Sequence, residues 1–224
     1  MKKIRLILLV ACCALMASCV SYTRGGLYPK MYEEKPLTLL VMPPINKTTN
    51  VEAKDLLYTS ISKPLAEAGY YVISPHLAME IFKNESAYDA EMFIDQNVGQ
   101  FGQVFGADAV VFSIIDQWKK KGTGIETEIT YLVKSTHTNE IIFQRTCDLY
   151  LNLYQDTGIG GWAGLIADVA LSAATTALTD HIEAARKCNQ FIFKDIPRGK
   201  YSPAYQKDMD EASEAQNIKK TISK

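Results

Sequence analysis

The pattern in this chain that comes nearest to a chemical site is rich in glycine. Residues 158–163 read GIGGWA, which fits the G-x-G-x-x-A pattern of dinucleotide-binding loops, where backbone N–H groups and a helix N-terminus hold a pyrophosphate. Dinucleotide loops follow a strand of a βαβ unit, whereas the segment before this one is expected to be an antiparallel hairpin. We therefore interpret the pattern as a glycine loop before a helix, with Trp162 as a candidate contact for a membrane surface or a partner.

The histidines and serines do not form a recognisable catalytic or metal site in the sequence. His76, His137 and His181 are far apart, and none has a second ligand at the spacing that metal sites use. Ser60 and Ser62 lack the G-x-S-x-G context of a hydrolase nucleophile. The sequence therefore predicts no catalytic residues, no metal ligands and no cofactor, and we expect that the protein is not an enzyme.

The first twenty residues predict a secretory signal and a site of lipid attachment. A basic start precedes an apolar run, residues 6–16, which is shorter than the roughly 20 residues of a membrane-spanning helix. The run leads into LMASC, which resembles the bacterial lipobox, so we expect cleavage before Cys19 and attachment of diacylglycerol and palmitate there. Val20 stands where many inner-membrane lipoproteins carry aspartate, which favours the periplasmic face of the outer membrane.

The rest of the chain alternates between strand and helix patterns. Residues 37–42, 70–73 and 109–115 are apolar runs typical of buried strands. Apolar spacing predicts a helix over 51–68 that Pro64 splits or kinks, another from Pro75 onward, and a third over 98–105. The side chains expected to face the core are Leu56, Leu57, Ile61 and Leu65 of the first helix, Leu77, Met79, Ile81 and Phe82 of the second, and Val98, Phe101, Val104 and Phe105 of the third.

A hairpin and a long helix complete the predicted fold. Alternating apolar residues over 124–154 predict two antiparallel strands with a turn at Thr138-Asn139. The glycine loop then leads into a helix that is rich in small residues and, at Asp168, too polar to span a membrane. The fold class is therefore α/β: a single domain with a mixed β-sheet, packed helices, an antiparallel hairpin and a long C-terminal helix.

Four segments follow from these patterns. They are a lipoprotein signal peptide (1–18), a lipidated tether (19–36), an α/β domain (37–194) and a polar C-terminal segment (195–224). The 224 residues suffice for one core, and the net charge of −1 gives no sign of nucleic-acid binding.

Cys147 and Cys188 either pair in an oxidising compartment or remain buried free thiols.

Pro43, Pro44 and Asn46 are the candidate interaction site within the domain. They follow the first apolar strand at its carboxyl end, where α/β sheets place their binding crevices. The alternative is a rigid turn leaving the strand, because proline cannot continue the hydrogen-bond ladder. The lysines at 119–121 end another strand, and we interpret them as solvated charges or as contacts to lipid headgroups.

Four separated segments, in this order, resemble one protein family. They are VMPPINKTTNVEAKD (41–55), PLAEAGYYVISP (64–75), FGADAVVFSIIDQW (105–118) and PRGKYSPAYQKD (197–208). Together they resemble a family of bacterial lipoproteins typified by an antigen identified from Neisseria genomes. The resemblance implies a small α/β domain similar to the amino-terminal domain of TolB and to the periplasmic domain of the secretion channel CsgG.

The same resemblance implies an accessory role in envelope secretion or assembly. On this basis we expect an outer-membrane-anchored periplasmic lipoprotein without enzymatic activity, with a CsgG-like lipoprotein as partner and with self-association into a homodimer. Two alternatives stay open, a pore-forming CsgG-like subunit and an enzyme acting on envelope glycan or lipid. The pore would need membrane hairpins of about ten residues a strand, and the enzyme a pocket with convergent carboxylates.

Overall fold

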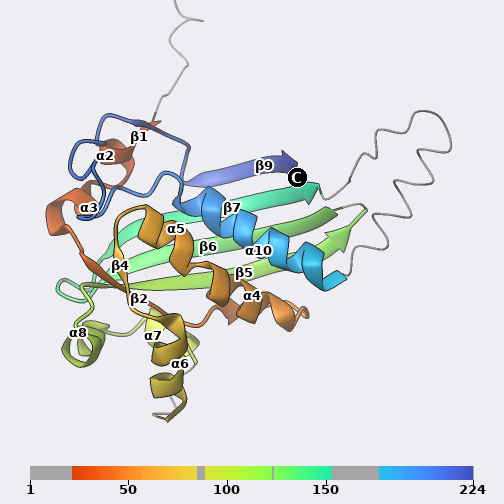
Figure 1. Ribbon diagram of the computed structural model, residues 1–224, viewed down its shortest axis with the longest axis horizontal. Coiled ribbons are helices and arrows are strands. Elements are labelled where there is room, and N and C mark those ends of the chain that lie inside the picture. The colour runs from red at the N-terminus through yellow and green to blue at the C-terminus, as the bar shows by residue number, and fades with distance from the viewer. Residues whose placement is uncertain (1–21, 85–88, 123, 153–176, 224) are drawn as a thin grey trace, which may run out of the picture.

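The computed structural model describes residues 22–84, 89–122, 124–152 and 177–223 (Figure 1). The helices are α2 (Arg24–Leu27), α3 (Pro29–Glu34), α4 (Glu52–Ser60), α5 (Ser62–Glu67), α6 (Pro75–Asn84), α7 (Glu91–Ile94), α8 (Gly99–Phe105) and α10 (Ala177–Phe193). The strands are β1 (Tyr22–Thr23), β2 (Thr38–Val41), β3 (Ile45–Asn46), β4 (Tyr71–Val72), β5 (Ala109–Lys121), β6 (Gly124–Ser135), β7 (Ile141–Asn152), β8 (Ala212–Ser213) and β9 (Asn217–Ser223). Among these helices, none is both long and apolar enough to cross a bilayer.

A seven-stranded mixed sheet organises the domain. The strand order is β4-β2-β5-β6-β7-β9, and the short β3 also pairs with β5. β2 runs parallel to β4 and β5, the long strands β5, β6 and β7 are antiparallel, and β9 lies parallel to β7 at the edge. The predicted α/β fold with a mixed sheet, an antiparallel hairpin and a C-terminal helix is therefore confirmed.

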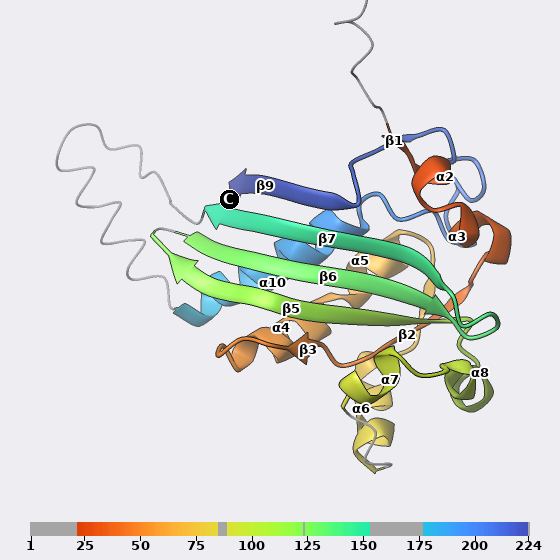
Figure 2. The same ribbon diagram turned by 180° about the vertical axis from the view of Figure 1, so that it is seen from behind.

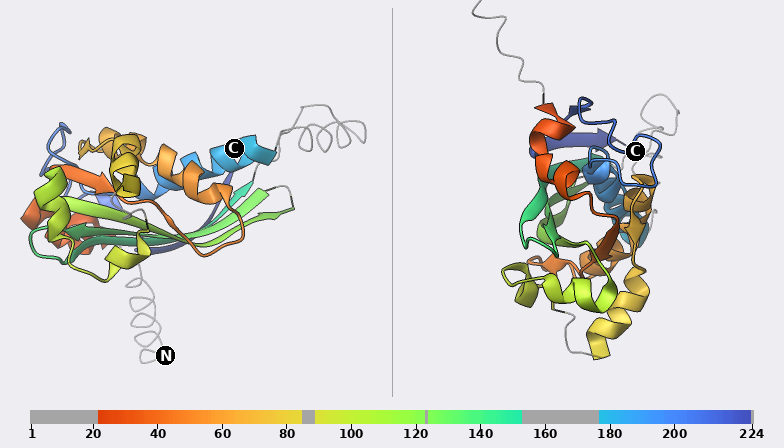
Figure 3. Two further views of the ribbon diagram at one scale, coloured as in Figure 1. Left: turned by 90° about the horizontal axis from the view of Figure 1, so that it is seen from below. Right: turned by 90° about the vertical axis from the view of Figure 1, so that its left-hand side faces the viewer.

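Two hydrophobic cores lie on opposite sides of the sheet. Figure 3 shows α4 and α10 against one face, where the larger core contains Leu39 and Val111. The neighbouring residues Leu40 and Phe112 point the other way and join a second core with α6 and α8. The apolar runs of β2 and β5 thus reflect burial on both faces. Figure 2 shows the reverse face of the long strands, which the helices of the described ranges leave uncrossed.

Proline, glycine and asparagine residues lie at the ends of helices and in turns of the structure. The first long helix is split as predicted, into α4 and α5, with Pro64 in the first turn of α5, where a missing N–H breaks no intrahelical bond. Gly106 ends α8 in the left-handed conformation. Asn139, at φ 62°, lies in the β6–β7 turn, which is the left-handed geometry that asparagine tolerates.

The tether predicted over 19–36 is wrong for residues 22–34, which are folded. β1 pairs with β8, and α2 and α3 bury Arg24, Met31 and Tyr32. Tyr28, between the two helices, packs on Phe143 of β7 with the ring centroids 4.5 Å apart. Burial of these large side chains stabilises the segment against the domain, which its glycines and prolines do not reveal.

The segment after residue 194 is also part of the domain, whereas the sequence predicts only a polar surface segment. β9 pairs with β7 along its whole length, from Asn217 opposite Thr146 to Ser223 opposite Asn152. Ile218 and Ile222 pack against the larger core, and Lys219 faces solvent. Lys220, on the same face as the two isoleucines, lies over the ring of Phe191 at 5.4 Å. The polar composition of this segment therefore does not reveal an edge strand that packs one face on the core.

Candidate docking groove

An apolar groove of about 390 Å³ lies among α6, α7 and α8. Its lining residues are Ile81, Phe82, Phe93, Gln100, Phe101, Val104 and Phe105. None of them carries an ionisable side chain, so the groove is suited to bind apolar surface rather than to move protons.

Four phenylalanines build the floor of this groove. Phe82 and Phe101 are almost fully buried and meet edge to face, with centroids 6.2 Å apart. Phe105 lies 5.5 Å from Phe82, and Phe93 lies 5.2 Å from Phe101 at an interplanar angle of 71°. Tilted and edge-to-face pairs at these distances attract each other beyond simple area burial, so the floor is a cohesive aromatic cluster.

Two apolar side chains that line the groove are left in solvent by the fold, Val104 at 68% and Ile81 at 42% exposed. Other exposed apolar side chains lie on the same helices: Leu77, one turn before Ile81 on α6, is 59% exposed, and Met92 on α7 is 62% exposed. The sequence predicts Leu77, Ile81 and Val104 as core residues, and this is wrong, because α6 and α8 each carry more apolar residues than one buried face can hold. That excess was the only signal of the groove in the sequence.

A lysine from the sheet holds the groove in place. The Nζ of Lys134, on β6, donates hydrogen bonds to the carbonyls of Ile94 (3.2 Å) and Gln96 (2.7 Å) at the end of α7. Val98, just before α8, donates its N–H to Oδ1 of Asn139 in the β6–β7 turn at 3.1 Å. The buried cation thus meets the free carbonyls at a helix C-terminus, an arrangement that favours positive charge.

The surface around the groove is predominantly acidic. Glu80 on α6, Asp89 before α7, Glu91 on α7 and Asp95 after it are all exposed, against one exposed lysine, Lys83, on the same elements. A binding segment with an apolar face and basic flanks would therefore complement this surface.

The proline pair predicted as an interaction site forms a turn between two strands. Both prolines are buried, and the strands on either side, β2 and β3, pair with the same strand β5. The side chain of Asn46 is used within its own loop: Oδ1 accepts from the N–H and hydroxyl of Thr48, and Nδ2 donates to the carbonyl of Asn50 at 2.7 Å. This geometry favours the rigid-turn alternative, and binding at Pro43, Pro44 and Asn46 stays a prediction.

Two of the predicted functional residues, Cys19 and Trp162, lie outside the described residues, as does the GIGGWA segment.

The three histidines lie in separate parts of the structure. His181 accepts a hydrogen bond from the indole N–H of Trp118 at 2.7 Å, His137 lies 3.4 Å from Asp108, and His76 pairs with Glu80 at 3.8 Å. Within the described ranges no three His, Cys, Asp or Glu side chains are grouped to hold a metal ion.

Of the two alternatives for Cys147 and Cys188, the structure has the free thiols. Both are buried, and Sγ of Cys188 lies 3.3 Å from the hydroxyl of Thr127. Burial raises the pKa of each thiol to about 12, so both are protonated at neutral pH. Because the thiolate is the nucleophile, neither cysteine is poised for chemistry.

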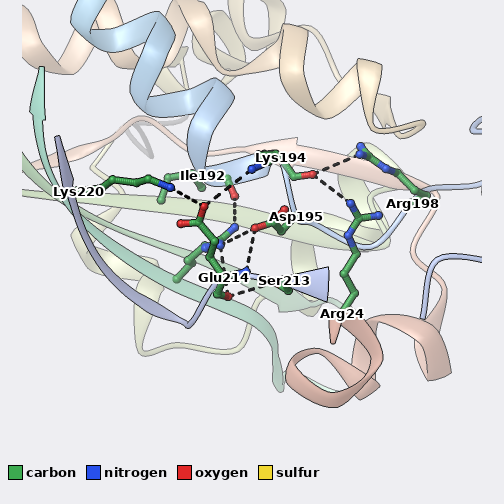
Figure 4. Close-up of polar contacts among 9 residues, drawn as sticks. Arg24, Ile192, Lys194, Asp195, Arg198, Ser213, Glu214 and Lys220 are labelled. Carbon is green, nitrogen blue, oxygen red and sulfur yellow. Dashed lines mark hydrogen bonds and ion pairs between the residues drawn. The ribbon is translucent and has the colours of Figure 1, made fainter. Parts of the chain in front are cut away.

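At the end of the domain opposite the groove, two buried arginines fasten the N- and C-terminal segments. Arg145 of β7 is fully buried and donates to Asp195 Oδ2 (2.8 Å) and to the carbonyl of Ile192 (2.9 Å). Figure 4 shows Asp195 beside Glu214, whose N–H donates to the same carboxylate and whose own carboxylate pairs with Lys220 at 2.8 Å. We call these residues the Arg145 cluster.

The second arginine, Arg24 of α2, joins three parts of the chain. Its Nη1 lies 2.8 Å from Oδ2 of the buried Asp208 and 2.9 Å from Glu211. Its Nη2 and that of Arg198 both point to the carbonyl of Lys194, at 3.5 and 3.2 Å (Figure 4). We call this set the Arg24 cluster, and it binds α2 to the C-terminal segment.

Comparison with known proteins identifies the family. A family profile described as "Putative lipoprotein GNA1162-like" matches residues 27–184, more than half of the chain. The chain belongs to this GNA1162-like family. The resemblance to Neisseria lipoproteins is thereby confirmed, and membership of a lipoprotein family indicates association with the cell envelope.

The individual proteins and solved structures that are similar to this chain share limited sequence identity with it. The "Putative lipoprotein NMB1124/NMB1162" of Neisseria meningitidis serogroup B is 32% identical over 110 residues, 49% of this chain and about half, 51%, of that protein. The crystal structure of lipoprotein GNA1162 from Neisseria meningitidis is 20% identical, with a TM-score of 0.46, over 63% of this chain and 100% of that one. A PelC dodecamer from Paraburkholderia phytofirmans is 12% identical, with a TM-score of 0.41, over 73% and 90%.

Proposed function

We propose that this protein is a non-enzymatic accessory lipoprotein, anchored through Cys19 to the periplasmic face of the outer membrane, that docks a partner protein in the α6–α8 groove. The observation that carries the proposal is the exposure of Ile81 and Val104 beside an aromatic floor. Contiguous exposed apolar surface bordered by charge is typical of a protein-binding site in a water-soluble domain.

The partner segment has a defined chemistry. It presents an apolar face to the phenylalanines and basic residues to the carboxylates around the groove, for which an amphipathic helix with lysine or arginine flanks is the simplest form. A CsgG-like lipoprotein of an envelope secretion complex is the partner class that we propose, and a second copy of the chain is the alternative occupant.

The groove and the β6–β7 hairpin do not favour the two rival functions, an enzyme acting on envelope glycan or lipid and a pore-forming subunit. An enzyme acting on glycan or lipid needs converging ionisable groups, and the groove is lined by six apolar residues and one glutamine. A pore-forming subunit needs a hairpin that can leave the domain, but the inward residues of β6 and β7, such as Ile129 and Leu149, are buried in the core beneath α10. Extracting them would expose apolar surface, which opposes insertion of this hairpin.

Site-specific photocrosslinking in cells tests the docking groove. A photoreactive residue is placed at Val104 in one strain and at Val51 in another; Val51, 82% exposed at the start of α4, is the matched control outside the groove. The expected result is a crosslink from position 104, and not from 51, to one envelope protein, with the crosslinked peptide apolar and flanked by basic residues.

Charge substitutions at the same two positions complete the test. Val104→Asp should weaken binding to the crosslinked partner by about tenfold or more, about 1.4 kcal/mol, because it sets an unpaired charge against apolar surface. Val51→Asp should leave binding unchanged, and Cys19→Ala should abolish the crosslink in cells without weakening binding in solution. Equal binding by the two aspartate variants would refute the groove as the docking site.

A further inference from the structure

The distance along the chain between the lipid and the folded domain is very short. If Cys19 is acylated, as the proposed function requires, only three peptide steps separate it from Tyr22, where β1 begins. At 3.3–3.6 Å per residue, a fully extended chain would place Tyr22 within about 11 Å of the acylated residue. The membrane surface must then lie directly beside the end of the domain that carries β1.

The folded end cannot easily release residues to lengthen this link. Backbone bonds join Arg24 to Glu211 (3.0 Å) and Gly25 to Met209 (2.9 Å), and Thr23 caps α2 with its hydroxyl. Unwinding α2 would also expose the buried Arg24–Asp208 pair and leave Asp208 without its cation. Separating a buried pair is strongly unfavourable, so the Arg24 cluster limits the link to the three peptide bonds between Cys19 and Tyr22.

Three exposed side chains, on β1 and on the segment that packs against α2, are of types found at lipid interfaces. Tyr22 is 41% exposed and Met209, against α2, is 43% exposed, with Lys207 exposed two residues before it. Tyrosine places an apolar ring and a polar hydroxyl at the boundary between lipid and water, and lysine can reach headgroup phosphates. We propose that this face, defined by Tyr22, Lys207 and Met209, rests on the phospholipid headgroups of the membrane that holds Cys19.

This contact orients the docking groove. β1 and α2 lie on the β9 side of the sheet and α6 and α7 on the opposite side, past β2. Figure 1 and the right-hand view of Figure 3 show the two pairs at opposite ends of the domain. The groove therefore lies at the end of the domain away from the bilayer, and its occupant reaches it from the aqueous compartment.

Fluorescence quenching in vesicles tests the orientation. The mature lipidated protein carries one new cysteine, Met209→Cys or, as a second probe, Lys207→Cys, with Val104→Cys as the groove control. Each is labelled with a thiol fluorophore, which the buried Cys147 and Cys188 should not take up. The proteins are placed in phosphatidylethanolamine–phosphatidylglycerol vesicles that contain a lipid with a nitroxide headgroup.

The expected result is loss of fluorescence at 209 and 207 and no loss at 104. Inserting twelve Gly/Ser residues between Val20 and Ser21, a linker of roughly 20 Å, should restore fluorescence at 209 while the protein still floats with the vesicles. Equal quenching at 209 and 104, or quenching at 209 that persists after the insertion, would overturn the inference. Failure of the parent protein to carry acyl chains on Cys19 or to float would instead refute the anchor in the proposed function.

Discussion

The substitution Asp195→Asn tests whether the Arg145 cluster stabilises the junction of β7, α10 and the C-terminal segment. Asp195 is almost fully buried and is the carboxylate that faces the fully buried Arg145. Asparagine keeps the shape and one acceptor oxygen but removes the negative charge, which leaves an uncompensated guanidinium in the core. Removal of one partner of a buried pair costs about 3–5 kcal/mol, and we expect about 3 for this isosteric change.

The control is an ion pair of nearly the same length in solvent, at 2.9 Å against 2.8 Å. Lys47 and Asp116 lie 2.9 Å apart with their side chains 56% and 36% exposed, so Asp116→Asn should cost less than about 1 kcal/mol. In a domain of this size, the loss in Asp195→Asn corresponds to a fall in Tm of roughly 6–12 °C. Urea unfolding followed by circular dichroism at pH 7 measures both variants against the parent protein.

The same experiment at lower pH separates charge from packing. Burial would raise the pKa of Asp195, but its hydrogen bonds from Arg145 and from the N–H of Glu214 outweigh burial and hold the pKa below its usual value. The stabilisation is then complete above the unfolded pKa of about 3.9 and is lost as the pH falls through the lower folded pKa. The parent and Asp195→Asn should converge in stability at acidic pH. If Asp195→Asn costs no more than Asp116→Asn at pH 7, the reasoning is refuted.

Three further predictions concern the core and the base of the groove. Iodoacetamide at pH 8 should leave Cys147 and Cys188 unmodified in the native protein, because their raised pKa values keep them as thiols, and should alkylate both in urea. Modification of either cysteine in the native protein would contradict this prediction. Gly69→Ala should destabilise the protein more than Gly106→Ala in thermal melts. Both glycines have positive φ, but only a Cβ at Gly69 would come within 2.5 Å of a backbone nitrogen, that of Ser202. Equal losses of stability in the two variants, near the 1–2 kcal/mol of left-handed strain, would contradict this prediction. Lys134→Met should raise hydrogen exchange in α7 by freeing its terminal carbonyls, and unchanged exchange there would show that this lysine does not hold the groove.

Local periodicity predicted the centre of the fold well. β5, β6 and β7 are long, and the residues of β6 alternate between the core and the open face, as Ile125 and Glu126 do, so the hairpin and its turn at Asn139 could be assigned from the sequence. β2 and β5 are buried on both faces and appear as continuous apolar runs. Each of these signals is contained within about ten consecutive residues.

The two ends of the domain could not be predicted in this way. Arg24 is a charged residue in a glycine-containing segment, and its partner Asp208 lies 184 positions away in an equally polar segment. Nothing local distinguishes such a buried pair from two solvated charges. The groove escaped prediction for a related reason: periodicity shows that Ile81 and Val104 belong to an apolar helix face, but not whether the fold covers that face.

The two arginine clusters fix how the N- and C-terminal segments attach to the domain. Buried ion pairs add little net stability relative to apolar packing, but a mispaired arrangement leaves charges unpaired in the interior and is strongly disfavoured. Arg24 therefore specifies how the segment after Cys19 docks, and Arg145 specifies how the C-terminal segment returns to β7. With both in place, β1, which follows the proposed lipid attachment site, and the α6–α8 groove lie at opposite ends of the domain. A partner bound in the groove would then be held at a set height above the membrane, which is the property that an accessory subunit of an envelope assembly requires.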